Sequence, residues 1–378
     1  MERLPTVTST AIDDVIAGFV PTRRFFRASF DTYLPDPRYP SQQAARERLR
    51  GFAAQISQAN RAHLLKRLMR KTPQGASAIY LDGGYGVGKT HLLAATYHAV
   101  NGERLYLSFG ELAYTISRLG LEPTLQAMEH TRLLCIDEFE LDDVAQTRMA
   151  SSFLRRLLDR RGESISVVTT SNTLPSDLGQ GRFAADSFQR EIGDIAARFE
   201  VLTIDGEDYR HRHWDELALA SSATVDATTL RALYEDDAAA DQARVLLDWP
   251  SLAMQLERVH PVHYAQIATR LDALFIERLD SIDDQAVALR LVHFVDKLYD
   301  QEVRLTVSTA AGLPLGDIFS RRYRHGGYEK KYRRCLSRLH ELVSETNALT
   351  RSAHRANGRA AGPAGRPDAR RGDRAPAD

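Results

Sequence analysis

The sequence predicts an α/β protein in which helices cover both faces of a parallel sheet, followed by a second, mixed α/β region. Two observations lead to this prediction. From residue 77 to residue 204, short apolar stretches alternate with helical ones, as in parallel sheets whose strands are connected by helices. Residues 83–90, GGYGVGKT, match the phosphate-binding pattern G-x-x-x-x-G-K-[S/T] at every defined position. The sequence therefore indicates the P-loop NTPase class of fold.

The expected core begins after an N-terminal segment. Residues 1–40 contain several prolines, and residues 41–71 show the apolar spacing of an amphipathic helix or a helix pair. Apolar and β-branched runs then predict strands at 77–82, 104–109, 132–136, 164–170 and 199–204, with helices at 89–100, 110–119 and 144–161 among the connections. We therefore expect a P-loop ATPase core over residues 41–206.

A mixed α/β region is expected to follow over residues 207–348 and to act as a lid or partner-binding region. Its predicted strands are 243–247, 273–278 and 302–308, and its predicted helices include 284–300 and 331–345. Residues 349–378 form the end of the chain. From Arg355 onward they consist mainly of Arg, Ala, Gly, Pro and Asp with no large apolar side chain, so we expect a disordered tail.

The phosphate loop assigns a chemical part to each of its residues. Backbone N–H groups of a glycine-rich turn and the following helix N-terminus attract phosphate oxygens. Lys89 is expected to reach the β- and γ-phosphates, and the Thr90 hydroxyl to ligate Mg²⁺. The alternative is a glycine-rich turn that only matches the pattern, which the flanking strand and helix disfavour. The expected ATP-binding residues are Gly83, Gly84, Tyr85, Gly86, Val87, Gly88, Lys89, Thr90 and His91.

An acidic pair follows the apolar run at residues 133–136. Asp137 and Glu138 stand at the carboxyl end of this predicted strand, the edge at which open α/β sheets bind ligands. Asp137 is expected to hold Mg²⁺, and Glu138 to polarise the attacking water. A strand simply ended by two acids is the alternative. The pair favours ATP hydrolysis over binding alone, because a kinase usually finds its nucleophile on the substrate.

A third polar group ends the strand predicted at 164–170. Asn172 follows Ser171 there, and Ser-Asn after a strand is also a common turn sequence. In AAA+ ATPases, however, a polar residue at the tip of the strand after the acidic pair touches the γ-phosphate or the lytic water. The order of phosphate loop, acidic pair and polar tip therefore predicts an AAA+-like P-loop fold with Asn172 in a catalytic position.

Composition excludes several other classes. The chain has 378 residues, and its 50 basic and 50 acidic residues give a formal net charge of zero, so no global field attracts nucleic acid or an anionic membrane. Its first residues do not resemble a signal peptide, and we see no apolar stretch long enough to span a bilayer. Two widely separated cysteines suggest no disulfide and fit a reducing cytoplasm.

Several further stretches resemble the ZapE family, the AFG-type AAA+ ATPases. They are PTRRFFRASF at 21–30, YLPDP at 33–37, DEF at 137–139, TSNTLP at 170–175, IDGEDYR at 204–210, FVDKLYD at 294–300 and SRL at 337–339. The resemblance covers residues 21 to about 345, and the DYR and DKLYD stretches are its most distinctive parts. It implies a cytoplasmic, nucleotide-dependent homo-oligomeric ATPase that acts in cell division with the tubulin-like FtsZ polymer.

The resemblance also points to arginines that would act on the nucleotide. The residue spacing after the strand predicted at 164–170 departs from the family pattern, however. Arg182 ranks first and Arg190 second as the arginine that a subunit contributes to its neighbour's γ-phosphate, and a salt-bridging surface arginine is the alternative for each. Arg290 lies where the family carries a lid arginine that senses the nucleotide, and Arg338 is a weaker candidate for that role. A surface helix arginine is the alternative for Arg290.

Two other functions remain open. The GKTHLL stretch at 88–93 also occurs in helicase loaders and replication initiators, which suggests a DNA-associated AAA+ ATPase. The basic residues within 321–334 are interleaved with tyrosines and could grip nucleic acid, but a solvated face or a subunit contact explains them as well. A scaffold with an inactive nucleotide site is disfavoured, because Lys89, Thr90, Asp137 and Glu138 are all present.

Overall fold

The predicted α/β core is confirmed in a computed structural model of the chain, in which residues 2–6, 16, 18–66, 78–84, 86–141, 144–159, 165–175, 189–207, 224–236, 243–320, 322 and 329–360 are described. Its strands form a parallel five-stranded sheet in the order β2-β3-β4-β1-β5. Their bounds are β1 Ala78–Gly83, β2 Arg104–Ser108, β3 Leu133–Asp137, β4 Ser166–Thr170 and β5 Glu200–Ile204. Because β4 lies between β1 and β3, the ends of these three strands meet at one edge.

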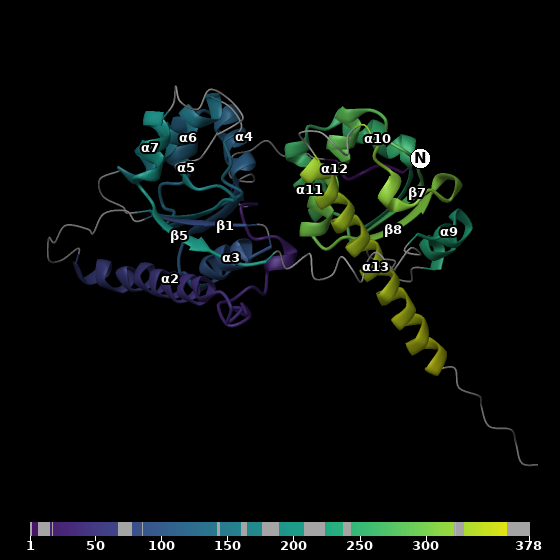
Figure 1. Cartoon of the computed structure of the whole chain (residues 1–378), viewed down its shortest axis with the longest axis horizontal. Helices are drawn as coiled ribbons and strands as arrows, with labels where there is room; N and C mark the ends of the chain where they lie inside the picture. The colour runs from purple at the N-terminus through teal and green to yellow at the C-terminus, as the bar shows by residue number, and fades with distance from the viewer. Residues whose placement is uncertain are drawn as a thin grey trace, which may run out of the picture.

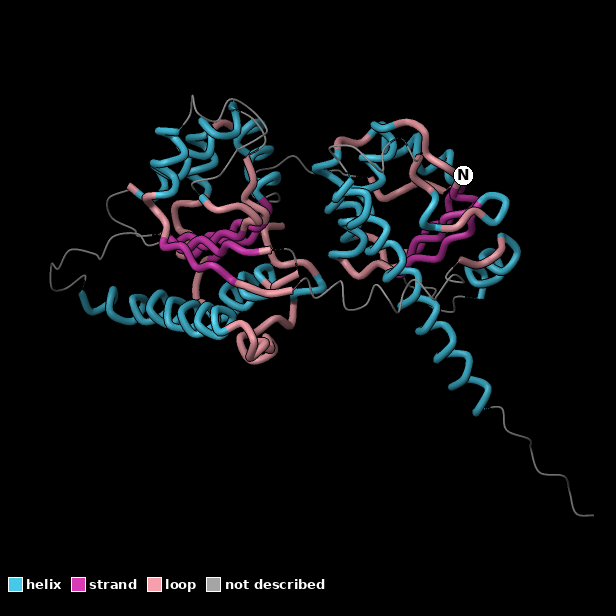
Figure 2. Tube along the Cα trace, in the orientation of Figure 1, coloured by secondary structure: helices cyan, strands magenta, loops and turns pink. Residues whose placement is uncertain are grey.

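Helices cover both faces of this sheet, as Figures 1 and 2 show. On one face lie α2 (Pro40–Lys66) and α3 (Lys89–Ala99), whose apolar side chains share a core with one side of the strands. On the other face lie α4 (Phe109–Leu119), α5 (Leu121–Ala127), α6 (Val144–Leu158) and α7 (Gln189–Ala196). Burial on both sides explains why the central strands are almost continuously apolar.

A second unit contains a parallel three-stranded sheet in the order β6-β7-β8. Its strands are β6 Arg244–Asp248, β7 Ala273–Leu279 and β8 Arg304–Thr309, and its helices are α9 Ala227–Asp236, α10 Trp249–Arg258, α11 Tyr264–Thr269, α12 Gln285–Asp300 and α13 Glu329–Ala360. Apart from α9, which packs through Leu230 against Ala273 and Phe275 of β7, these elements share a core of their own. The mixed α/β content expected for this region is therefore present, whereas its role as a lid stays a prediction.

The N-terminal segment contacts both units. Leu4 is buried in the core of the second unit, and its backbone N–H donates to the Gln255 side chain at 2.8 Å. Phe19 is buried in the core of the first unit, where the Tyr106 N–H donates to its carbonyl at 2.8 Å. The short helix η1 (Arg23–Phe25) follows. This segment therefore joins the two units in addition to the chain that runs between their sheets.

The largest difference from the predicted elements is at the end of the chain. Helix α13 runs from Glu329 to Ala360, whereas the sequence predicts a helix over 331–345 and a disordered tail from residue 349. Arg and Ala are good helix formers, so a helix anchored by its apolar first half can continue beyond its last apolar residue. Residues 361–378 lie outside the described part of the chain. Among the helices that are described, none is long and apolar enough to cross a membrane.

Candidate nucleotide-binding site

The phosphate loop runs from β1 into α3, as its sequence predicts. Gly88, the residue before α3, has a φ of 89°, a left-handed conformation that favours glycine. The Lys89 ammonium donates to the carbonyls of Gly83 at 2.7 Å and Gly84 at 2.6 Å. It also donates to Asn172 Oδ1 at 2.9 Å. The buried ammonium therefore lies at the opening of the loop, next to the tip of β4. Tyr85 lies outside the described residues.

Asp137 is half-buried at the end of β3 among hydroxyl groups. Thr90 Oγ1 donates to its Oδ1 at 3.3 Å, Tyr106 OH donates to its Oδ2 at 3.0 Å, and Thr170 Oγ1 also donates to Oδ1. Burial, followed by the nearby Glu138 carboxylate, raises the pKa of Asp137 to about 6. Tyr106 and Thr170 are the site residues that sequence reasoning missed here, since each lies on a different strand from Asp137.

The chemistry of this arrangement suits a divalent cation. Mg²⁺ prefers hard oxygen ligands and usually keeps several waters, so one carboxylate and one hydroxyl are typical protein ligands. Thr90 and Asp137 provide both, next to the loop where phosphates would bind. A bound cation would also compensate the half-buried carboxylate, whose ionised form is otherwise disfavoured by desolvation.

Glu138 has an unusual backbone. Its φ is 52°, in a region that non-glycine residues rarely adopt. The conformation is held because its N–H donates to Asp137 Oδ1 at 3.2 Å and to Thr170 Oγ1 at 3.0 Å. Its side chain is 58% exposed. The backbone is therefore fixed while the carboxylate stays accessible to water, and such backbone strain is often found at functional sites.

Asn172 lies at the tip of β4, next to Lys89. Its Nδ2 donates to Glu140 Oε1 at 3.0 Å while its Oδ1 accepts from Lys89, so both ends of the amide are held. An open cavity of about 470 Å³ adjoins this group and is lined by the ends of β1, β4 and β5, including Gly83, Gly84 and Asn172. The structure thus brings together Lys89 and Asn172, and Thr90 with Asp137, which sequence reasoning assigned to one site.

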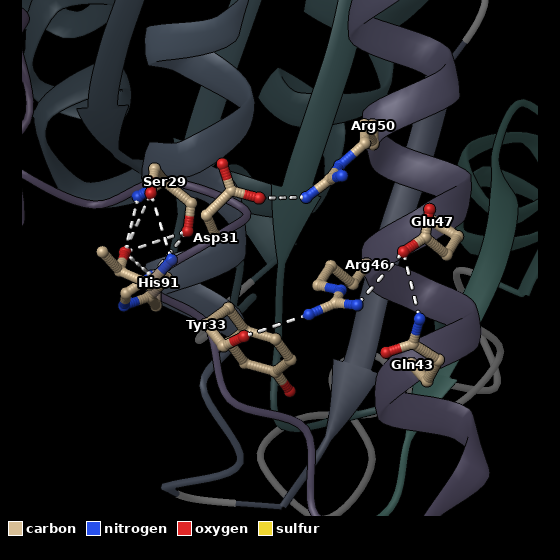
Figure 3. Close-up of polar contacts among 9 residues, drawn as sticks. Ser29, Asp31, Tyr33, Gln43, Arg46, Glu47, Arg50 and His91 are labelled. Carbon is tan, nitrogen blue, oxygen red and sulfur yellow. Dashed lines mark hydrogen bonds and ion pairs between the residues drawn. The ribbon is translucent and has the colours of Figure 1, made fainter.

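His91 has partners on the N-terminal segment. Its Nε2 lies 3.0 Å from the Ser29 carbonyl and 3.0 Å from Thr32 Oγ1 (Figure 3). Burial lowers the pKa of His91, so the neutral ring is favoured at this contact. In this structure His91 holds the N-terminal segment against α3, and its expected place among the nucleotide-binding residues stays a prediction.

Tyr33 makes a related contact that the sequence did not indicate. Its hydroxyl donates to the Val87 carbonyl at 3.0 Å, and burial raises its pKa to about 12, which keeps the proton on the oxygen. Its own carbonyl accepts from Arg46 of α2 at 3.4 Å, as Figure 3 shows. The N-terminal segment therefore supports the back of the phosphate loop.

Among the described residues, two of the predicted arginines, Arg290 and Arg338, contact groups of the second unit. Arg182 lies outside the described residues, and Arg190 is exposed in the first turn of α7. Arg290 donates to the carbonyls of Leu256 at 3.0 Å and Val259 at 3.2 Å, so it caps the end of α10, and its expected role as a nucleotide sensor stays a prediction. Arg338 forms an ion pair with Asp296 at 2.6 Å.

Residues 321 and 323–328 of the basic 321–334 patch lie outside the described part of the chain. Two of its described members pair with acids: Arg333 with Glu329 at 2.6 Å and Arg334 with Asp296 at 2.7 Å. A basic surface offered to nucleic acid would leave such charges available, so these pairs favour a structural role for the two arginines.

Comparison with known proteins gives a family match over most of the chain. A family model described as AFG1-like ATPase matches residues 23–351. The cell division protein ZapE of Escherichia coli (strain K12) is 26% identical over 301 residues, which are 71% of this chain and 78% of that protein. An insertion sequence IS21 putative ATP-binding protein of Pseudomonas aeruginosa is 34% identical over 140 residues, 35% of this chain and 52% of that protein.

Among solved structures, the crystal structure of the DnaC helicase loader matches at 20% identity with a TM-score of 0.34, covering 48% of this chain and 99% of that chain.

Proposed function

Because the chain belongs to the AFG1-like ATPase family, we propose that it binds ATP with Mg²⁺ and hydrolyses it to ADP and phosphate at the site around Lys89. One observation carries the proposal: Lys89 reaches both the loop carbonyls and Asn172, while Thr90 contacts Asp137, so the ends of β1, β3 and β4 form one group. These are the chemical groups that phosphoryl transfer to water requires.

In this proposal each side chain has a separate task. Lys89 would leave the loop carbonyls to bind the β- and γ-phosphates. Thr90 and Asp137 would hold Mg²⁺, which would supply positive charge beside the phosphates. Glu138 orients and polarises the attacking water. Asn172, held between Lys89 and Glu140, contacts the γ-phosphate or that water. The support for these tasks is the arrangement of the residues and their order along the chain.

The cellular role we propose is that of a division ATPase. The support is the similarity to the cell division protein ZapE of Escherichia coli over 71% of this chain. In this role the protein works in the cytoplasm as a nucleotide-dependent homo-oligomer, with FtsZ or other division proteins as partners. Measuring ATP turnover with and without purified FtsZ filaments tests whether FtsZ is a partner. An unchanged rate, together with no cosedimentation of the protein with the filaments, would show that FtsZ is not a partner.

A DNA-associated AAA+ ATPase is the second candidate, favoured by the GKTHLL stretch at residues 88–93. Titration with single-stranded DNA at several salt concentrations separates the two. Phosphate contacts weaken steeply with salt, so strong, salt-dependent binding would support the DNA-associated function.

The hydrolytic assignment is tested by two substitutions. Lys89→Ala is expected to abolish ATP binding, because it removes the positively charged ammonium group that would bind the phosphates. Glu138→Gln is expected to bind ATP with normal affinity and to lower turnover by about a hundredfold or more, the contribution of one positioned general base. The measurements are equilibrium binding of a fluorescent ATP analogue and phosphate release.

Glu257→Gln is the matched control, since Glu257 is an exposed carboxylate on α10 in the second unit. It should behave as the wild type. Turnover close to wild type in Glu138→Gln would show that Glu138 does not polarise the attacking water.

A further inference from the structure

A buried ion cluster in the second unit faces the site. Asp296 of α12 contacts two arginines of α13: Arg334 Nη2 at 2.7 Å and Arg338 Nη1 at 2.6 Å. The side chains of Asp296 and Arg338 are each 10% exposed, and that of Arg334 is 22% exposed. Burial alone would raise the pKa of Asp296, but Arg338 and Arg334 outweigh it and the pKa is lowered. The carboxylate is therefore ionised and fixed between the two guanidinium groups.

This cluster extends to the residue after β3. Arg334 Nη1 lies 3.9 Å from Glu138 Oε1, so one guanidinium faces Asp296 with one nitrogen and Glu138 with another. Lys297 is close as well: burial would lower its pKa, but Glu111, Asp300 and Glu138 raise it. Glu138 of the first unit therefore interacts electrostatically with Lys297 of α12 and Arg334 of α13, across the junction between the two units.

The charges explain why Glu138 is attracted to α13. One carboxylate, Asp296, faces two guanidinium groups that remain protonated, so the three side chains carry one net positive charge. Glu138 brings a further negative charge to within 3.9 Å of the Arg334 guanidinium. Arginine suits this task because its planar fork presents donors in two directions, whereas the single ammonium of lysine cannot hold both carboxylates in the same way.

We propose that Arg334 is a positioning residue for Glu138, through which the second unit orients the carboxylate that polarises water. This inference rests on the proposed function, in which Glu138 has that task. Asp296 holds Arg334 from one side, and Arg334 limits where the exposed Glu138 side chain can point. Loss of Arg334 leaves the phosphate loop and the cation site intact but removes this constraint from the carboxylate.

The contact is suited to orientation more than to stability. At 3.9 Å with a carboxylate that is 58% exposed, the Arg334–Glu138 pair is screened by solvent. Its loss should therefore show in the hydrolytic step. Misplacement of a catalytic group by about 1 Å can cost on the order of a hundredfold in rate, so we expect a fall in kcat of about ten- to a hundredfold.

The experiment compares Arg334→Gln in the wild type and in the Glu138→Gln background. In the wild type, kcat should fall by about ten- to a hundredfold while KM and ATP affinity stay within about twofold. In the Glu138→Gln background, a single-turnover measurement should show no further loss, because Arg334 acts through the carboxylate that is already absent. Arg333→Gln is the matched control: Arg333 is the preceding residue, is 71% exposed and pairs with Glu329.

Three results would overturn the inference. A wild-type kcat in Arg334→Gln would show that Glu138 needs no help from α13. A further loss in the Glu138→Gln background would show that Arg334 acts independently of Glu138. A fall in ATP affinity equal to the fall in kcat would show that Arg334 binds the nucleotide directly.

A second variant keeps the test decisive if Arg334→Gln does not fold. Arg334→Lys retains the charge beside Asp296 but cannot hold both carboxylates, so it should keep the fold, lower kcat and again have no effect in the Glu138→Gln background. The outcomes also distinguish an error in the proposed function from an error in the inference about Arg334. If Glu138→Gln itself turns over like the wild type, the task of Glu138 is wrong; if it is inactive while both Arg334 variants are normal, only the inference about Arg334 is wrong.

Discussion

At Gly88 the phosphate loop packs closely against the N-terminal segment. A Cβ atom at this position would lie 2.5 Å from Tyr33 Cε2, and the backbone φ is 89°. Any side chain here therefore meets both an aromatic ring and an unfavourable backbone conformation. The glycine that the phosphate-binding pattern demands also permits the packing of Tyr33, which holds the loop from behind through Val87.

Substitution of Gly88 tests this close packing. Gly88→Ala is expected to lower the free energy of unfolding by about 1–3 kcal/mol, the range for a strained backbone conformation, and to weaken ATP binding. The control for stability is Gly84→Ala, because a Cβ at Gly84 meets nothing within 4 Å. Thermal and denaturant unfolding give the stability, and equilibrium titration gives the affinity. Equal stability of the two variants would contradict the role assigned to the Tyr33 contact.

At the scale of elements, the short helix η5 (Pro261–His263) of the second unit meets α4 of the first. His263 Nε2 lies 3.1 Å from Tyr114 OH, and the Tyr114 ring stacks on His260 with centroids 5.7 Å apart. Burial, followed by His260 and Arg118, lowers the pKa of His263. The folded protein therefore favours the neutral ring at this junction.

The lowered pKa predicts a pH dependence. Below about pH 6.5, the ordinary pKa of histidine, the unfolded chain binds a proton at His263 more readily than the folded protein does. The contribution of this group to stability is therefore complete above pH 6.5 and decreases as the pH falls toward the folded-state pKa. The stability difference between the wild type and His263→Gln should change in that direction between pH 8 and pH 5.5, as followed by guanidinium unfolding midpoints.

The control for this comparison is His130→Gln, which removes a histidine that is 79% exposed on a different part of the first unit. A difference between wild type and His263→Gln that stays constant over the same pH range would disprove the junction's sensitivity to protonation.

At the scale of the whole molecule, the N-terminal segment holds the nucleotide site and the second unit together. Arg23 pairs with Asp272 at 3.3 Å, and the Arg24 guanidinium lies 3.6 Å from the centre of the Tyr299 ring. Tyr33, nine residues further on, contacts the phosphate loop. Tyr299 and the cluster at Asp296 belong to the same helix, α12. The Arg24 contact and the cluster at Asp296 therefore lie on the same part of α12, which the DKLYD stretch marks.

The proposed homo-oligomer makes a further prediction at this scale. Arg182 is the first candidate, and Arg190 the second, for an arginine that acts on the neighbouring subunit's γ-phosphate, since a guanidinium stays charged and matches developing phosphate charge. Mixing Glu138→Gln subunits with Arg182→Ala subunits should restore part of the activity that each lacks alone, because one supplies the arginine and the other an intact site. Phosphate release measures the recovery.

Crosslinking provides the control by showing that mixed assemblies form. Absence of recovery in confirmed mixed assemblies would place Arg182 outside the neighbouring site. An ATPase rate that rises only linearly with protein concentration would argue against dependence on assembly.

Local patterns predicted most of the core, because they reflect local physical requirements. The phosphate loop, the acidic pair and the polar tip each follow a strand, and every strand of the core begins and ends within two residues of its predicted bounds. The second unit was less predictable. The sequence indicated its strands, but the parallel order of β6, β7 and β8 arises from pairing between segments far apart in the chain. The extension of α13 to Ala360 was missed because helix propensity was judged from apolar spacing.

The sequence by itself determined the class of fold, the family resemblance and the residues proposed to handle phosphate and magnesium, since each depends on residues that are close together in the chain. Tertiary structure decided which distant groups meet them. Tyr33 reaches Val87, 54 residues away, Arg290 caps α10, and Arg334 reaches Glu138 from the second unit. Such contacts depend on how separate elements pack. From the sequence alone, an arginine on the surface cannot be distinguished from one that contacts a distant residue of the site.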